Sequence, residues 1–167
     1  LFSKDVSDID ISMAAVKNLS EKYKASLTTT GSRFAVNANE PCAFVLSEAG
    51  QVRYVSRSKY LNEIKGWIDF NIPLPKGSVA HRLTQNPSKT EDYDELASDV
   101  WFNGGIRNRP IVAEEAILLR EWDQCLSLIW FDQSLEPPHQ LHHDDEDEPL
   151  LEELDGNLPW PSKRRRK

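Results

Sequence analysis

Residues 41–57, PCAFVLSEAGQVRYVSR, decide the fold of this chain. Residues 42–46 form an apolar run rich in β-branched and aromatic side chains, which is the composition that strands prefer. A Glu-Ala-Gly turn follows at residues 48–50, and residues 52–55 resume the strand-like pattern. Together they predict a β-hairpin, and the remaining elements can be arranged around it.

Two short helices are predicted before this hairpin. Residues 12–23 place apolar side chains at helical spacing after Ser12, which is a favoured N-cap residue type. After a short break, Ser26 can cap a second helix over residues 27–35. Two helices joined by so short a turn predict a helix-turn-helix-like unit over residues 1–38.

The second of these helices carries the candidate recognition residues. In a DNA-binding motif it would present polar side chains to a groove or to phosphates, from Ser26, Thr28, Thr29, Ser32 and Arg33. Residues 1–40 hold five basic and five acidic side chains, so the electrostatic contribution to DNA binding would be small. The alternative interpretation, a helical hairpin that packs on a neighbouring domain, is favoured by this balance.

A crossing loop is predicted after the hairpin, over residues 58–77. It contains aromatic side chains, and its prolines, Pro73 and Pro75, exclude a central strand or a helix interior. Such a loop suits a lid over a concave apolar pocket. The candidate pocket residues are Arg57, Trp67, Phe70 and Arg82. The alternative is that Trp67 and Phe70 simply fill the core.

The rest of the folded part is predicted to add a helix and further strands. A helix over residues 79–83 is followed by a polar loop at 88–98, with a helical turn near its end, and by a short strand at 100–102. A second hairpin pairs residues 116–119 with residues 125–131. About five largely antiparallel strands with covering helices make an α+β fold.

Composition and charge agree with one main domain followed by a tail. The 167 residues are 39% hydrophobic and 28% charged, with a net charge of -7. Residues 136–162 hold nine carboxylates and no lysine or arginine, whereas residues 163–167 are all basic. We therefore predict an acidic and then basic flexible tail over residues 136–167.

The tail also holds residue types that bind metals. They are His139, His142, His143, Asp144 and Asp145. They follow a Pro-Pro pair in a segment without periodicity, where ligand geometry would not be preorganised, so a solvated charge run is favoured. We expect no metal site in this chain.

Known catalytic motifs are absent from the sequence. It has no phosphate-binding loop, no dinucleotide fingerprint, no nucleophile elbow and no His-Glu-x-x-His. Cys42 and Cys125 begin apolar runs, which suits buried thiols in a reducing compartment and not nucleophiles. We expect a cytoplasmic protein without a membrane span, without enzymatic activity of its own and without a cofactor. Because the chain begins at Leu1 without a methionine, we expect it to be a piece of a longer protein.

The order of these features resembles a known family. Residues 12–35, SMAAVKNLSEKYKASLTTTGSRFA, precede residues 40–58, EPCAFVLSEAGQVRYVSRS, and residues 114–131, EEAILLREWDQCLSLIWF, follow, with a PWP motif at 159–161. This order is similar to the part of ImmA/IrrE-type metallopeptidases that comes after their zinc domain. The likeness covers residues 1–135.

The resemblance implies a recognition and sensing role. It implies that residues 1–38 are the helix-turn-helix-like unit and that residues 41–135 form a GAF-like domain. The implied partners are a repressor protein, which the family's peptidase cleaves in stress or mobile-element responses, or a small-molecule signal. Zinc is implied only if a peptidase domain precedes Leu1. The alternative is a stand-alone DNA-binding regulator with a ligand-sensing GAF-like domain.

Overall fold

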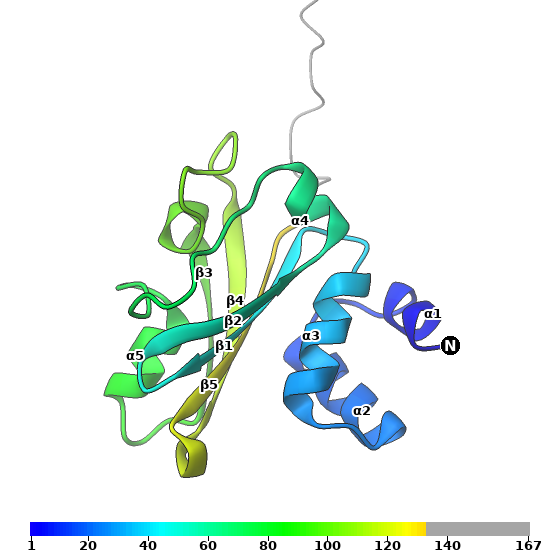
Figure 1. Ribbon diagram of the computed structural model, residues 1–167, viewed down its shortest axis with the longest axis horizontal. Helices are drawn as coiled ribbons and strands as arrows, with labels where there is room; N and C mark the ends of the chain where they lie inside the picture. The colour runs from blue at the N-terminus through cyan, green and yellow to red at the C-terminus, as the bar shows by residue number, and fades with distance from the viewer. Residues whose placement is uncertain (133–167) are drawn as a thin grey trace, which may run out of the picture. The chain divides into compact units, whose positions relative to one another are not determined.

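A five-stranded antiparallel sheet with helices on both faces forms the centre of the protein (Figure 1). The computed structural model describes residues 1–132. The predicted α+β fold is confirmed. The predicted tail over residues 136–167, with His139, His142 and His143, lies outside the described residues.

The sheet is built from two hairpins and one further strand. The strands are β1 (Cys42–Glu48), β2 (Gln51–Arg57), β3 (Glu91–Ala97), β4 (Ile111–Leu119) and β5 (Gln124–Trp130). Their order is β2-β1-β5-β4-β3, and every neighbouring pair is antiparallel. The two predicted hairpins are therefore β1–β2 and β4–β5, and they meet at the centre of the sheet. The edges are β2 and β3.

Two local predictions between the hairpins are wrong. Residues 88–98, predicted as a loop with a helical turn, contain β3. Residues 100–102, predicted as a strand, begin with the last residue of the short 3-10 helix η1 (Ser98–Val100) and belong to no strand. β3 reads EDYDELA, and its side chains are polar on both faces, so no apolar period marks it. Pairing with β4 over seven residues outweighs this weak strand propensity.

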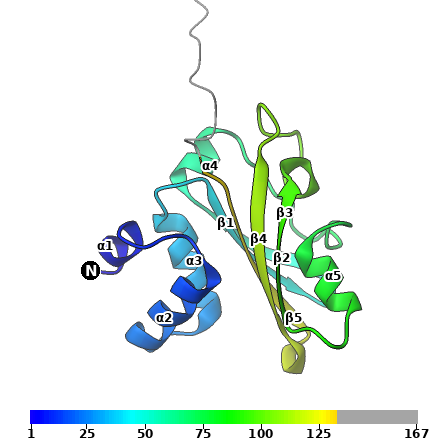
Figure 2. The same cartoon turned by 180° about the vertical axis from the view of Figure 1, so that it is seen from behind.

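Three helices lie on one side of the sheet, and the first of them packs on the outside of the third, away from the strands (Figure 2). They are α1 (Phe2–Ser7), which the sequence analysis did not predict, α2 (Met13–Tyr23) and α3 (Leu27–Asn37). The side chains of Ser12 and Ser26 accept hydrogen bonds from the amides of Ala15 and Thr29, so both predicted N-caps are present. The two longer helices share one hydrophobic core with the sheet. The residues of this core that come from the sheet include Cys42, Phe44, Ile117, Leu126 and Leu128.

The opposite face is covered by α5 (Val79–Gln85), by α4 (Lys59–Glu63) and by two long connections. Its core contains Val45 and Ile129 from the sheet, Leu83 from α5, and Trp101 and Phe102 from the connection between β3 and β4. Both faces of the sheet are thus buried. No helix within residues 1–132 is long and apolar enough to cross a membrane.

Gly31 sets how closely α3 approaches the sheet. It is buried in the middle of the helix, and a β-carbon built on it would lie 2.2 Å from a ring atom of Phe44 in β1. Phe44 is itself fully buried, so its ring has little room to move. Only glycine allows the helix to lie against this ring.

Gly31→Ala should destabilise the fold although alanine favours helices. The gain in helix propensity is about 1 kcal/mol, whereas overpacking a buried aromatic contact typically costs about 1–3 kcal/mol. We expect a net loss of unfolding free energy, measured by urea denaturation. Val36→Ala, at an exposed position of the same helix, is the control and should change stability little. An unchanged or higher stability of Gly31→Ala would contradict the close contact.

Candidate functional site

A groove of about 430 Å³ lies along the second half of edge strand β2. One wall is the strand itself and the other is the segment of residues 67–70 from the crossing loop. Its lining residues are Arg53, Tyr54, Val55, Arg57, Trp67, Ile68, Asp69 and Phe70. Three of these side chains are aromatic and two are basic, which makes the groove our candidate site.

The crossing loop is held against β2 by backbone hydrogen bonds just beyond the groove. The Val52 amide donates to the Ile72 carbonyl at 2.8 Å, and the Asn71 amide donates to the Val52 carbonyl at 2.7 Å. Ile68 and Leu74 are buried in the core below. The loop is therefore anchored on both sides of Phe70, and its exposed side chains sit on a fixed backbone.

Trp67 and Phe70 do not fill the core. Trp67 is 51% exposed and Phe70 is 64% exposed, although Ile68 and Leu74 of the same loop are buried. Isolated exposed aromatics are common in folded proteins, but a cluster beside a groove is characteristic of a binding surface. Tyr54, which is 45% exposed, also borders the groove, and its hydroxyl lies 3.0 Å from the Ser32 hydroxyl of α3.

Arg57 is held in place by Trp67. The guanidinium carbon of Arg57 lies 3.9 Å from the centroid of the Trp67 ring, and Nη1 donates a hydrogen bond to the Gly66 carbonyl at 3.2 Å. Burial lowers the pKa of Arg57 from its ordinary value, which is so high that the side chain stays charged at neutral pH. A positive charge is thus fixed at one end of the groove.

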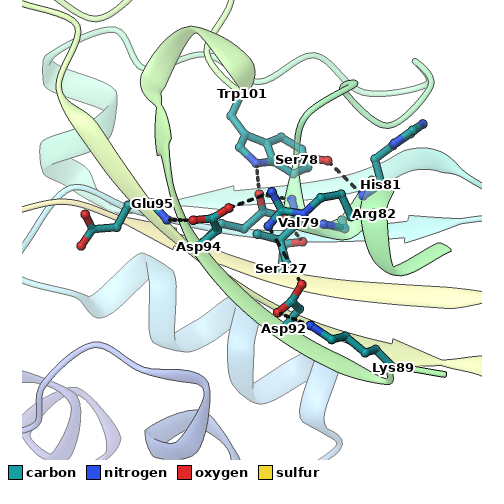
Figure 3. A network of polar contacts seen from close by, with 12 residues as sticks. Ser78, Val79, His81, Arg82, Lys89, Asp92, Asp94, Glu95, Trp101 and Ser127 are labelled. Atoms are coloured by element: carbon teal, nitrogen blue, oxygen red, sulfur yellow. Dashed lines mark hydrogen bonds and ion pairs between the residues drawn. The ribbon is translucent and has the colours of Figure 1, made fainter. Parts of the chain in front are cut away.

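The predicted pocket residues come together only in part. Arg57, Trp67 and Phe70 line the same groove, whereas Arg82 lies on α5 and forms an ion pair with Asp94 of β3 at 2.8 Å (Figure 3). This pair lowers the pKa of Asp94. Arg82 therefore belongs to the contact between α5 and β3.

The predicted recognition residues of α3 are largely engaged within the fold. Ser26 caps its helix, and the Ser32 hydroxyl lies 3.0 Å from the Tyr54 hydroxyl. The Arg33 guanidinium lies 5.0 Å from the ring centroid of Phe2. Thr29 is exposed, and Thr28 is half-buried. The contact between Ser32 and Tyr54 links this helix to the groove strand.

Sequence reasoning missed one buried carboxylate, that of Glu114 in β4. Its side chain is fully buried and accepts four hydrogen bonds. The donors are Trp101 Nε1 at 2.7 Å, the Val79 amide at 2.9 Å, the Ala80 amide at 3.0 Å and the Ser127 hydroxyl at 3.1 Å, and three of these residues are labelled in Figure 3. The sequence did hold a signal for its burial. Glu114 lies two residues from Val112 and from Ala116 and four from Leu118, so it shares one face of the strand with these buried residues.

Glu114 acts as a structural clamp and not as a free acid. Burial raises its pKa, and the four donors oppose this by stabilising the charged form. Because two carboxylate oxygens offer about four acceptor sites, the donors leave none directed at a substrate. The carboxylate instead joins β4 to β5, to the start of α5 and to Trp101.

Residues with metal-binding or nucleophilic side chains do not form a further site in the described part of the chain. No group of three or more His, Cys, Asp or Glu within residues 1–132 is placed to hold a metal ion. Cys42 and Cys125 are free and buried, and burial raises the pKa of Cys125 to about 12. A thiol in that environment is not a nucleophile at neutral pH.

Replacing Trp67 should cost little stability because its ring is half-exposed. We expect Trp67→Ala to lower the unfolding free energy by about 1–2 kcal/mol, from partial burial and the contact with Arg57. Trp101→Ala is the comparison, since Trp101 is only 2% exposed, and truncating a buried aromatic side chain costs about 3–5 kcal/mol. Chemical denaturation of both variants measures the difference. Equal losses would mean that Trp67 belongs to the core.

Glu114→Gln should destabilise the fold strongly. The amide NH₂ would face N–H or O–H donors, so at least part of the network would be left unpaired, at a cost on the order of 2–4 kcal/mol. Glu121→Gln changes the same chemical group at an exposed position of the β4–β5 connection and should stay within about 0.5 kcal/mol of the parent protein. Thermal and urea unfolding give both values. A neutral effect of Glu114→Gln would contradict the clamp.

Comparison with known families and curated proteins identified no relative of this chain. No model of a known protein family matches this chain, and no curated protein matches it. The candidate site therefore rests on its own geometry, and the resemblance to ImmA/IrrE-type metallopeptidases stays a prediction.

Proposed function

We propose that this chain is a non-catalytic recognition module and that the groove between β2 and residues 67–70 is its binding site. The observation that carries the proposal is the pair of exposed rings, Trp67 and Phe70, beside a fixed arginine, Arg57. Both hydrophobic cores are filled by other side chains, so packing alone gives no reason to expose these rings.

The residue types in the groove support protein or ligand recognition. Tryptophan, tyrosine and arginine are enriched among the interface residues that contribute most to binding energy. All three residue types line the groove. Trp67 comes from the crossing loop, and Arg53, Tyr54 and Arg57 come from β2. Trp67 lies on the anchored loop and Arg57 stacks on its ring, so these two side chains are in place before binding, which lowers the entropy that binding must overcome.

The wider setting follows from the resemblance. In it, this chain is the recognition and sensor portion of an ImmA/IrrE-like regulator, with a GAF-like sheet, and its partner is a repressor protein or a small-molecule signal. Zinc and peptidase activity would belong to another domain of such a regulator. A cytoplasmic location is part of this proposal, because Cys42 and Cys125 are free and buried.

DNA binding by α3 has less support. The inner face of the helix packs on the sheet, Ser26 is used as a cap, and Arg33 stacks on Phe2. Lys22, in the last turn of α2, forms an ion pair with Asp5. Within residues 1–132, Lys24 of the turn and Arg33 have no ion pair, and two cations supply little electrostatic attraction for phosphates.

Selection from a displayed library of random nonapeptides tests the proposed site. The purified chain should enrich peptides that bind the parent protein, with affinity reduced on the order of tenfold or more by Trp67→Ala, as expected for a central aromatic anchor. Isothermal titration calorimetry measures both affinities. Trp122→Ala is the matched control, because Trp122 is also more than half exposed, at 62% against 51% for Trp67, but does not line the groove.

Two outcomes would overturn the proposal. One is a selection that yields no peptide above background. The other is a set of peptides whose affinity falls equally in the Trp67 and Trp122 variants, because such binding would not depend on the groove.

A further inference from the structure

We infer that the occupant of the groove is an extended peptide segment that adds to the outer edge of β2 as a sixth strand, with an acidic side chain directed at Arg53. This inference rests on the proposed function, since it names the class of partner for the same site. Strand addition of this kind obtains affinity from backbone hydrogen bonds and specificity from alternate side chains.

The backbone of β2 has unused hydrogen-bonding groups beside the groove. The Ser58 amide donates to the Cys42 carbonyl at 2.8 Å, so residue 58 faces β1. Because neighbouring residues of an antiparallel strand point their backbone groups to opposite sides, Arg57 and Val55 face outward. Within residues 1–132, the outward backbone groups of these two residues have no hydrogen-bonding partner.

The crossing loop already uses the adjacent part of the same edge. Residues 71 and 72 pair with Val52, and the Leu74 amide donates to the Gly50 carbonyl at 2.9 Å. An irregularity in the β1–β2 register follows, at Arg53, and the loop then leaves the edge. The groove lies where this pairing stops, so an added strand would continue an edge that is already half covered.

The other edge of the sheet is built differently. β3 carries the sequence EDYDE at its start, and natural sheets use charged side chains on edge strands to prevent pairing with other chains. The open half of β2 carries no acidic residue and has Val55 between Arg53 and Arg57. Both edges are charged, but the arginines of β2 would attract a strand that carries an acidic side chain, so this edge is suited to accept such a strand.

Charge identifies the chemistry of the partner. Arg53 is exposed and has no ion pair or side-chain hydrogen bond with any of residues 1–132. Asp69, the acidic residue of the lining, accepts a hydrogen bond from the Asn103 side chain. Two arginines and one aspartate line the groove, so the net charge of its lining is positive. A complementary segment has one acidic and one apolar side chain on the same face, an even number of residues apart.

The shape of the groove favours a peptide over a small molecule. Sites for small ligands usually enclose most of the ligand surface, whereas Trp67 and Phe70 are more than half exposed. A strand laid along β2 would cover these rings from outside and still keep its own outer edge in water. A small-molecule signal would not need the outward backbone groups of Val55 and Arg57.

N-methylation of a selected peptide, one backbone amide at a time, tests strand addition. In an added strand only alternate amides point toward β2, so affinity should fall about tenfold or more at every second position and change less than about threefold at the others. Calorimetry with the intact chain gives the pattern. Equal tolerance at all positions, or equal loss at all positions, would overturn the inference.

A charge exchange tests the acidic contact. Arg53→Glu should weaken the selected peptide about tenfold, and a peptide with lysine in place of its acidic residue should recover the affinity for this variant. Lys4→Glu, an exposed charge reversal on α1, is the control and should leave the affinity unchanged. Failure of the lysine peptide to recover binding would overturn the acidic contact.

The results separate this inference from the proposed function. If no peptide depends on Trp67, the recognition site itself is wrong. If peptides depend on Trp67 but show no alternating effect of N-methylation, the groove recognises side chains alone, and only strand addition is wrong.

Discussion

The burial of one carboxylate constrains the whole α5 side of the sheet. A buried ionised group is tolerated only when hydrogen bonds replace the water it has lost, and Glu114 obtains four of them from three separate parts of the chain. Two donors are the first amides of α5, where a helix has unpaired N–H groups and its dipole favours negative charge. The position of α5, and of the connection that carries Trp101, is therefore set by a side chain of β4.

The groove depends on a second constraint, the way in which the crossing loop is fixed. Ile68 and Leu74 enter the core, and residues 71 and 72 pair with β2, so the backbone between them has little freedom. Trp67 and Phe70 are left outside because their buried neighbours already occupy the space below. An exposed aromatic cluster on a rigid loop costs stability in water, and a binding role gives a reason for it.

The sequence allowed much of the fold to be predicted, because its strongest signals are local. The Glu-Ala-Gly turn predicted the first hairpin, and Ser12 and Ser26 predicted where α2 and α3 begin. β3 could not be recognised, since its stability comes from pairing with β4 and its side chains carry no apolar period. The exposure of Trp67 depends on packing between distant segments, and the role of Glu114 depends on which face of β4 is buried, so neither could be read from composition or spacing.

The coverage of both sheet faces by helices and connections has a kinetic consequence. A partner that docked on either face would first have to displace packed side chains, and association would then be limited by the rate of local opening. A partner that binds at the edge of the sheet finds its contact atoms already in place. The two proteins can then associate as nearly rigid bodies. In the proposed role, the part of the molecule that keeps it folded would thus be separate from the part that exchanges partners.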